Sequence, residues 1–486
     1  MSKDIKALLR LLGTLMMAEG AAMLSCLIPA LHFHDGTWLP MLLSGLFTLI
    51  VGFLMRYAYS DYKVIRDRRM SYLLVVLIWV VLSLFGVLPF MATGAVGGFT
   101  DAFFESMSGL TSTGATILPD IEAMPSSILL WRSMTEWIGG FGIVLLVLAI
   151  VPSLGINKYS LYTAEASGAD NTGKLTTAMG ITVRHTLTIY VALTAGFIVI
   201  LMCTGMHFWD AVNMTFTNIS SGGFAIYNDS IASLTHVQQY ILAAQMLFSG
   251  VNFAMLYLMF TLDWKKISHK WDQFRCYIGI LVVASTFVVV SLHYKMGYCW
   301  DDAMRFGVVQ TLSVVTTTGS VISDTTQWWV PLMFLFAILP MTGGMAGSTT
   351  GGLKVMRVLI LLRNVKCILR NRLHPRSVSP VRLNGRPLSG EIITNVMVIF
   401  FVYIVVMFIG TLALLLCGIN ATESIGAMVG CLTSYGPGLG ASGGFGSYAA
   451  FTGSAKWICA MAMLMGRLEC MSVMMVMMPG FWRRQG

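Results

Sequence analysis

The sequence has few charged residues for its length. Only 11% of its 486 residues are Asp, Glu, Lys or Arg, whereas a soluble domain of average composition carries about 25%. Hydrophobic residues make up 56% of the chain, which leaves too little polar surface to cover a water-soluble globule. This deficit excludes an ordinary soluble protein and predicts an all-α polytopic membrane protein.

Other absences exclude further classes. The nine cysteines contain no CxxC pair and mostly lie in apolar segments, so they predict neither a disulfide framework nor a metal site. There is no HExxH motif, Ser/His pair or phosphate-binding loop, and we therefore expect no enzyme activity. The net charge of +9 could indicate nucleic acid binding. However, the cations cluster between hydrophobic segments, which is typical of membrane orientation and predicts no nucleic acid partner.

Ten segments are apolar enough to cross a bilayer, which takes about 20 helical residues. The first has a basic head but no clear small-x-small cleavage site, so we interpret it as an uncleaved span. An even number of spans places both termini on the same side. The predicted spans are 8–31, 39–59, 71–93, 127–152, 179–204, 237–262, 276–294, 328–364, 392–418 and 456–479.

Most lysines and arginines fall on one side of this arrangement. They lie near the N-terminus and in the connections 56–69, 265–275 and 354–386. Because cytoplasmic connections carry the excess of positive charge, we expect both termini in the cytoplasm.

Four outward connections, 101–116, 210–225, 302–320 and 423–438, resemble one another. Each starts with an acidic residue, continues through an apolar stretch too short to span, and ends in a Ser/Thr/Gly cluster. The acid stands 13 residues before an aligned glycine in three connections and 17 before it in the third, about one helical turn more.

This internal repeat predicts four pseudo-symmetric helix–pore loop–helix units around one central pore, with four re-entrant pore helices. The predicted divisions are an N-terminal helical pair (1–62) and repeats one to four (63–158, 159–270, 271–372 and 373–486).

The connections carry groups suited to a cation. We expect the leading acids to cap short helices, where a carboxylate accepts hydrogen bonds from free backbone amides. The carbonyl ends of these helices would then converge at the bilayer centre with partial negative charge. Glycine lets successive carbonyls in the following Ser/Thr/Gly strings face one axis, and such a ring can replace the hydration shell of potassium. No histidine or thiolate cluster points to a transition metal. The acids are Asp101, Asp210, Asp302 and Glu423.

At TSTGAT (111–116), SSGGF (220–224), TTTGS (316–320) and TSYGPG (433–438), the chain resembles the Trk/Ktr/HKT superfamily of potassium transporters, and most closely its bacterial TrkH/TrkG branch. The resemblance covers essentially the whole chain and implies a filter that prefers potassium to sodium. The fourth segment departs most, because a stiff proline follows its glycine. The implied filter residues are Thr111, Ser112, Thr113, Gly114, Ser220, Ser221, Gly222, Gly223, Thr316, Thr317, Thr318, Gly319, Thr433, Ser434, Tyr435 and Gly436.

The resemblance also implies a setting. It implies a multi-pass protein of the bacterial cytoplasmic (inner) membrane that transports potassium and holds no organic cofactor in this chain. It further implies a homodimer with one pore per protomer and a separate cytoplasmic ring of nucleotide-binding, TrkA-like regulatory subunits. The basic segment 363–386 is a candidate docking surface for that ring, and contact with anionic lipid is the equal alternative.

The predicted span 328–364 contains five glycines within 341–352. Each glycine costs about 1 kcal/mol in a helix relative to alanine, so we expect a break there. The break is either a cytoplasmic turn or an intramembrane loop, and the resemblance implies a gate loop below the filter. The implied gate residues are Gly343, Gly344, Gly347, Ser348, Thr349, Gly351, Gly352 and Arg467.

Arg467 lies at the centre of an apolar segment, where a charge is costly and should face the pore or a partner. Glu469 is two residues further on and should point elsewhere on a helix. Our hypothesis is that Arg467 forms an electrostatic barrier to ions, and a helix-packing ion pair is the alternative.

These features predict potassium uptake through a gated, carbonyl-lined filter. The alternative is a secondary transporter that couples potassium to protons or sodium, or that carries another small solute. Such a transporter typically binds its substrate between paired broken helices, and only one broken helix is predicted here.

Overall fold

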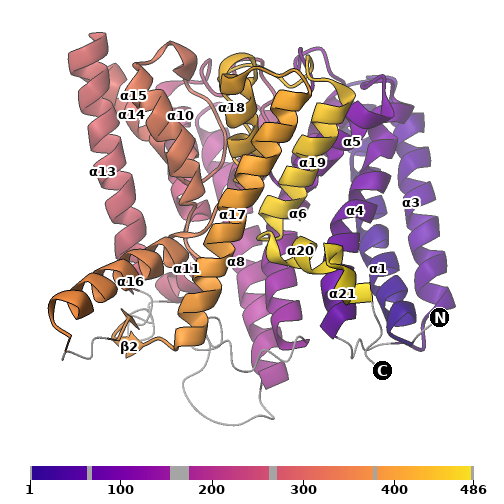
Figure 1. Ribbon diagram of the computed structural model, residues 1–486. Helices are drawn as coiled ribbons and strands as arrows, with labels where there is room; N and C mark the ends of the chain where they lie inside the picture. The colour runs from indigo at the N-terminus through magenta and orange to yellow at the C-terminus, as the bar shows by residue number, and fades with distance from the viewer. Residues whose placement is uncertain (1–2, 63–67, 154–174, 262–270, 376–379, 483–486) are drawn as a thin grey trace.

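The computed structural model describes residues 3–62, 68–153, 175–261, 271–375 and 380–482, whose regular secondary structure is almost entirely helical (Figure 1). Within these ranges the strands are β1 (Arg382–Leu383) and β2 (Arg386–Pro387), which form a short antiparallel hairpin. The prediction of an all-α polytopic protein is confirmed.

The N-terminal pair consists of α1 (Lys3–Ser25), continued by α2 (Leu27–His32), and α3 (Trp38–Ala58). Its long helices cross where glycines leave room for close backbone approach. A Cβ built on Gly13 would lie 2.6 Å from the carbonyl oxygen of Gly52. Small residues at such crossings are typical of helix association in membranes.

Four short helices contain the predicted leading acids in their first turns, and the other helices flank them. The short helices are α5 (Phe99–Leu110), α9 (Phe208–Ile219), α14 (Trp300–Val315) and α18 (Ala421–Leu432). The flanking helices are α4 (Arg68–Ala92), α6 (Ser126–Ser153), α8 (Leu175–Cys203), α10 (His236–Ser249), α11 (Phe253–Phe260), α13 (Trp271–Met296), α15 (Val330–Ile338), α16 (Val355–Leu373), α17 (Gly390–Leu416), α19 (Gly453–Arg467), α20 (Met471–Met477) and α21 (Pro479–Trp482). Three 3-10 turns are η2 (Thr325–Gln327), η3 (Leu339–Met341) and η4 (Gly440–Ser442).

The prediction of a single broken helix is wrong. The predicted span 237–262 bends by 107° between α10 and α11, and the span 456–479 bends by 116° between α19 and α20. The expected break in 328–364 is present, because α15 and η3 are separated from α16 by an irregular loop. The helix after each of the second, third and fourth pore helices is therefore interrupted.

Among the described residues, six helices are long and apolar enough to cross a membrane, and eight if each bent pair forms one span. Two of the ten predicted spans lie outside this set. One is the interrupted α15–α16 segment. The other is α6, whose second half lies among residues whose side chains the structure does not describe.

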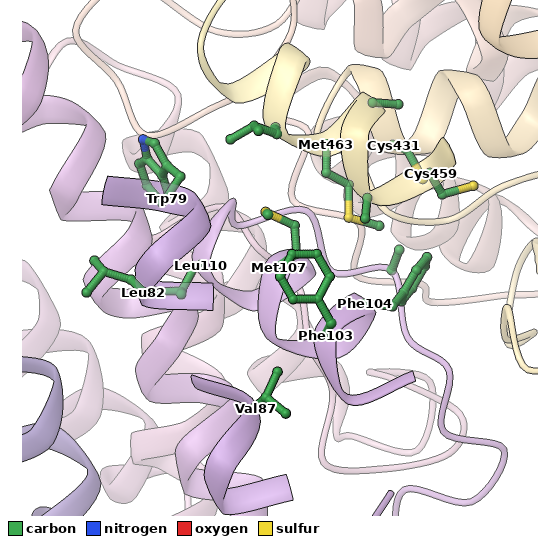
Figure 2. Close-up of a cluster of buried hydrophobic side chains, with 14 of the residues drawn as sticks. Trp79, Leu82, Val87, Phe103, Phe104, Met107, Leu110, Cys431, Cys459 and Met463 are labelled. Atoms are coloured by element: carbon green, nitrogen blue, oxygen red, sulfur yellow. The ribbon is translucent and has the colours of Figure 1, made fainter. Parts of the chain in front are cut away.

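The short helices pack in a closed cycle. α9 packs on α6, α14 packs on α10, and α18 contacts η3, so each lies against an element that follows the pore helix of the preceding unit. α5 closes the cycle, because it packs on α19 of the last unit. Figure 2 shows this contact, in which Phe103, Phe104 and Met107 lie between α4 and the Cys459–Met463 stretch of α19.

The chain starts and ends at the same end of the helical bundle, opposite the short helices (Figure 1). The α4 residue Arg69 donates to the carbonyl oxygen of Phe481 at 3.3 Å, which places α21 beside the start of α4. The predicted boundaries at 62–63, 158–159 and 270–271 fall on or beside segments outside the described residues.

Candidate cation pathway

The four leading acids occupy the same helical position, but that position is not the cap. Asp101, Asp210, Asp302 and Glu423 stand in the first turn, three residues after the capping residue. In two helices another side chain accepts at the cap instead: Asn420 accepts from the Glu423 amide at 2.9 Å, and Cys299 accepts from the Asp302 amide. The prediction of caps is therefore wrong by one turn, although a first-turn carboxylate still complements the helix dipole.

The four short helices end in the same hydrogen-bond pattern. In the first helix, the Thr113 amide donates to the Ser108 carbonyl and the Ser112 amide donates to the Gly109 carbonyl. These two bonds form a Schellman motif. The same pair of bonds recurs at the ends of α9, α14 and α18. The left-handed residue of each motif is serine or threonine, where glycine is usual: Ser112, Ser221, Thr317 and Ser434, with φ of 48°, 54°, 52° and 54°. The same uncommon conformation therefore recurs at equivalent positions of all four segments.

The aligned glycines bring the four segments into one closed ring. A Cβ on Gly114 would overlap the carbonyl oxygen of Gly222 in the second segment, and one on Gly223 would overlap that of Thr318 in the third. A Cβ on Gly319 would likewise overlap the carbonyl oxygen of Tyr435 in the fourth segment, and one on Gly436 would overlap that of Thr113 in the first. All four glycines also have positive φ, from 77° to 91°. Glycine is required at each position, both by conformation and by close approach of the next segment.

The ring opens into a hollow that all four glycines line, together with Ala115, Phe224 and Val321. Residues of the connections that follow the short helices, such as Ile121, Asn228 and Ser442, also line this hollow. The sixteen residues that sequence reasoning proposed for the filter thus lie together, in four equivalent turns around one axis.

Sequence reasoning missed a set of buried polar residues behind this ring. Arg132 on α6 pairs with Glu105 on α5 at 2.8 Å, and both side chains are buried. In the sequence, both are charged residues in or beside apolar segments. Their partners are distant in sequence, so only the fold identifies them.

A second buried acid explains why the second segment reads SSGG. Glu136 on α6 accepts from the Phe224 amide at 3.2 Å through both carboxylate oxygens. Its carboxylate fills the space that a side chain at position 222 would need. The equivalent positions of the other segments hold Thr113, Thr318 and Tyr435, whereas Glu136 leaves no room for a side chain at position 222.

The fourth segment has its own supports. The Tyr448 hydroxyl donates to the carbonyl oxygen of Gly436 at 2.9 Å, and the Tyr448 amide donates to Thr116 of the first segment at 2.8 Å. The Tyr435 hydroxyl accepts from Gln310 on α14 at 3.5 Å. The aromatic hydroxyls thus anchor the segment that departs most from the others.

The glycine-rich loop 341–352 lies against the ends of the pore helices. Its Gly351 amide donates to the Thr317 hydroxyl at 2.7 Å, and its Gly352 amide donates to the Thr433 carbonyl at 2.9 Å. The Thr349 hydroxyl donates to the carbonyl of Ile219, the last residue of α9, at 3.0 Å. The loop therefore contacts the second, third and fourth units directly, on the inner side of the ring.

The loop is also tied to the break between α10 and α11. The Met345 amide donates to the Gly250 carbonyl at 2.9 Å, and the Phe253 amide donates to Gly347 at 3.1 Å. Asn252 donates from its side chain to Ala346 at 2.6 Å. The break in α10–α11 thus supplies the surface that holds the loop.

Arg467 joins the loop to the first unit. Its guanidinium donates to the Thr349 carbonyl at 2.9 Å and to the Gly139 carbonyl at 2.8 Å, and lies 3.4 Å from the Ser112 hydroxyl. The side chain is buried, and none of these contacts is to a carboxylate. As predicted, Glu469 points elsewhere and pairs with Arg357 on α16.

Comparisons with known proteins show what the chain as a whole resembles. A family model for TrkH, described as a cation transport protein, matches residues 41–481. The Trk system potassium uptake protein TrkH of Halomonas elongata is 32% identical over 99% of this chain and 100% of its own length. Its Escherichia coli K12 counterpart is 32% identical over 98% of this chain and 99% of its own length. The crystal structure of the potassium transporter TrkH from Vibrio parahaemolyticus superposes with a TM-score of 0.90 at 30% identity, covering 99% of this chain and 100% of that one.

Proposed function

Because this chain belongs to the TrkH family of cation transport proteins, we propose that it takes up potassium ions through the ring of four glycine-bearing segments. The single observation that carries the proposal is the closed ring, in which each aligned glycine abuts a backbone carbonyl of the next segment. Backbone carbonyls converging on one axis are the ligands that replace the hydration shell of potassium in selective filters.

Uptake needs no coupled ion under this proposal. A membrane potential of about 100 mV, inside negative, contributes about 2.3 kcal/mol for each positive charge that enters. At about 1.4 kcal/mol per tenfold ratio, this would hold roughly a fiftyfold accumulation.

The test is rubidium uptake into liposomes that contain the purified protein. Gly223→Ala should abolish most uptake, because the added methyl overlaps the Thr318 carbonyl oxygen. Gly205→Ala is the matched control: Gly205 also has positive φ, at 86°, but nothing lies within 4 Å of its Cβ position. Equal uptake by the two variants would argue against the ring as the pathway. Uptake that depends on an imposed proton or sodium gradient would instead favour coupled transport.

We propose that the loop 341–352 and Arg467 close the inner end of this pathway. The support is that the loop bonds to three of the four units while Arg467 bonds to the remaining one. A buried cation at this position would also repel an incoming ion.

We propose the same cellular setting that the resemblance implies. The protein would lie in the bacterial cytoplasmic membrane with both termini inside, as a homodimer of four-repeat chains divided at 62–63, 158–159, 270–271 and 372–373. A cytoplasmic ring of nucleotide-binding subunits would regulate it. Co-purification of such a ring with the intact chain, and its loss at high salt if basic residues of 363–386 hold it, would test that part.

A further inference from the structure

The Arg132–Glu105 ion pair lies behind the outer ends of the first two filter segments. Arg132 donates from Nε to Glu105 Oε1, and the exposed fractions of the two side chains are 1% and 0%. Among the ion pairs between described residues, no other is buried to this degree on both sides. Apolar residues of similar volume often stabilise a protein as well as a buried ion pair does, so stability alone does not account for this one.

Glu105 holds the first segment where it leaves the filter. The Thr116 hydroxyl donates to Glu105 at 2.9 Å, and the Ile117 amide donates to its other carboxylate oxygen at 3.0 Å. These residues stand two and three positions beyond Gly114. The carboxylate therefore fixes the direction of the chain just outside the ring.

Arg132 extends the same support to the second segment. It donates from Nη2 to the Thr116 hydroxyl at 3.2 Å and from Nη1 to the Ala225 carbonyl at 3.0 Å. Its guanidinium also lies over the Phe224 ring, 4.1 Å from the centroid. Ala225 stands two positions beyond Gly223, as Thr116 does beyond Gly114. One side chain thus joins equivalent points of two adjacent segments.

The third segment has a neutral residue at the position of Glu105, which shows what the charge of Glu105 contributes. Gln310 stands nine residues before Gly319, as Glu105 stands nine before Gly114, and it accepts from the Ile322 amide at 3.1 Å. A neutral amide is therefore sufficient to hold one segment. The charge of Glu105 is needed to hold the guanidinium that spans two.

We infer that Arg132 and Glu105 are a positioning pair that sets the spacing of the first two segments and thereby the discrimination between potassium and sodium. The inference rests on the proposed function. Selectivity in a carbonyl filter depends on the number and arrangement of the coordinating oxygens. A displacement of two of the four segments should therefore change selectivity before it abolishes flux.

The experiment measures rubidium uptake by the full chain in liposomes, with external potassium or sodium as competitor. Arg132→Lys keeps the charge but loses the planar fork that reaches three acceptors at once. It should raise the effectiveness of sodium relative to potassium about tenfold, which corresponds to about 1.4 kcal/mol. Thr116→Val removes only the bridging hydroxyl and should cause a smaller change in the same direction. If Arg132→Lys does not fold, Thr116→Val decides.

Arg305→Lys is the matched control, because Arg305 on the pore helix α14 is also a buried arginine but donates to Gln239 and Asp302, not to a filter segment. It should keep the wild-type competition ratio. Unchanged ratios in both Arg132→Lys and Thr116→Val, or an equal change in Arg305→Lys, would overturn the inference while wild-type uptake leaves the proposed function standing. A wild-type protein that carries neither rubidium nor potassium would overturn both.

Discussion

At the scale of single residues, the second filter segment depends on Glu136. This carboxylate satisfies the Phe224 amide and occupies the space beside Gly222. Glu136→Gln keeps an acceptor of the same shape and should leave thermal unfolding in detergent nearly unchanged. Glu136→Leu leaves the Phe224 amide buried without a partner, which costs about 1–3 kcal/mol, and should lower the unfolding temperature. Equal unfolding temperatures for the two variants would contradict this role.

Some site residues could be predicted from the sequence and others could not. The aligned glycines are predictable because each has a positive φ and leaves no room for a Cβ beside the next segment, so no other residue fits. Glu105, Arg132 and Glu136 are single charges in or near apolar helices. Their functional contacts are to backbone groups at Ile117, Ala225 and Phe224, and no spacing along the chain reveals such contacts.

The same limit applies to the acids at the pore-helix starts. The sequence places them at the beginning of a short helix but does not separate a cap from the third helical residue. Asn420 and Cys299, which accept at the cap, are three residues earlier than Glu423 and Asp302.

At the scale of elements, the interrupted helices explain the largest error in the predicted fold. The α10–α11 break contains Gly250 and Asn252 within an apolar run, and the α19–α20 break contains no glycine or proline. One glycine costs about 1 kcal/mol in a helix, so local propensity gives only a weak signal for the first break and none for the second. The α10–α11 break is instead stabilised by tertiary bonds to the loop 341–352, which is distant in sequence.

Asn252 offers a test of that coupling. Its side chain caps α11 by accepting from the Met255 amide at 2.9 Å, and it donates to Ala346 of the loop. Asn252→Asp keeps the cap but loses the donor, so it should release the loop and raise uptake while α11 persists. Asn252→Leu also loses the cap, which contributes about 1 kcal/mol, and should be less stable to heat. Wild-type uptake in Asn252→Asp would show that this bond does not restrain the loop.

Arg467 tests the proposed barrier at the loop. Arg467→Gln removes the positive charge and weakens the bonds to Thr349 and Gly139, so we expect rubidium uptake to rise several-fold. Arg467→Lys keeps the charge but loses the planar guanidinium that bonds to both carbonyls. This variant therefore separates electrostatic repulsion of the ion from tethering of the loop. Low uptake in Arg467→Lys favours repulsion, whereas uptake equal to that of Arg467→Gln favours tethering. Unchanged uptake in Arg467→Gln would contradict both.

At the scale of the whole molecule, the ring combines four-fold and asymmetric features. The filter turns are equivalent in all four units, because each ends in the same motif and abuts the next. The supports around them differ: an ion pair and Glu136 serve the first two segments, Gln310 serves the third, and Tyr448 serves the fourth. The loop 341–352, which contacts the inner side of the ring, belongs to the third unit. The repeat is predictable from sequence spacing, and the differences between units are not.

Because residues of all four units form the ring, a cation bound there should stabilise the entire fold. A ligand that binds only the folded state adds RT ln(1 + [L]/Kd), about 2.7 kcal/mol at a hundredfold excess over Kd. Thermal unfolding in detergent should therefore shift to higher temperature in potassium chloride than in sodium or choline chloride at equal ionic strength. Gly223→Ala should lose this difference, since its methyl overlaps the Thr318 carbonyl oxygen, whereas Gly205→Ala should keep it. Identical unfolding temperatures in the three salts for the wild-type protein would mean that the ring holds no preferred ion, and the filter assignment would then fail.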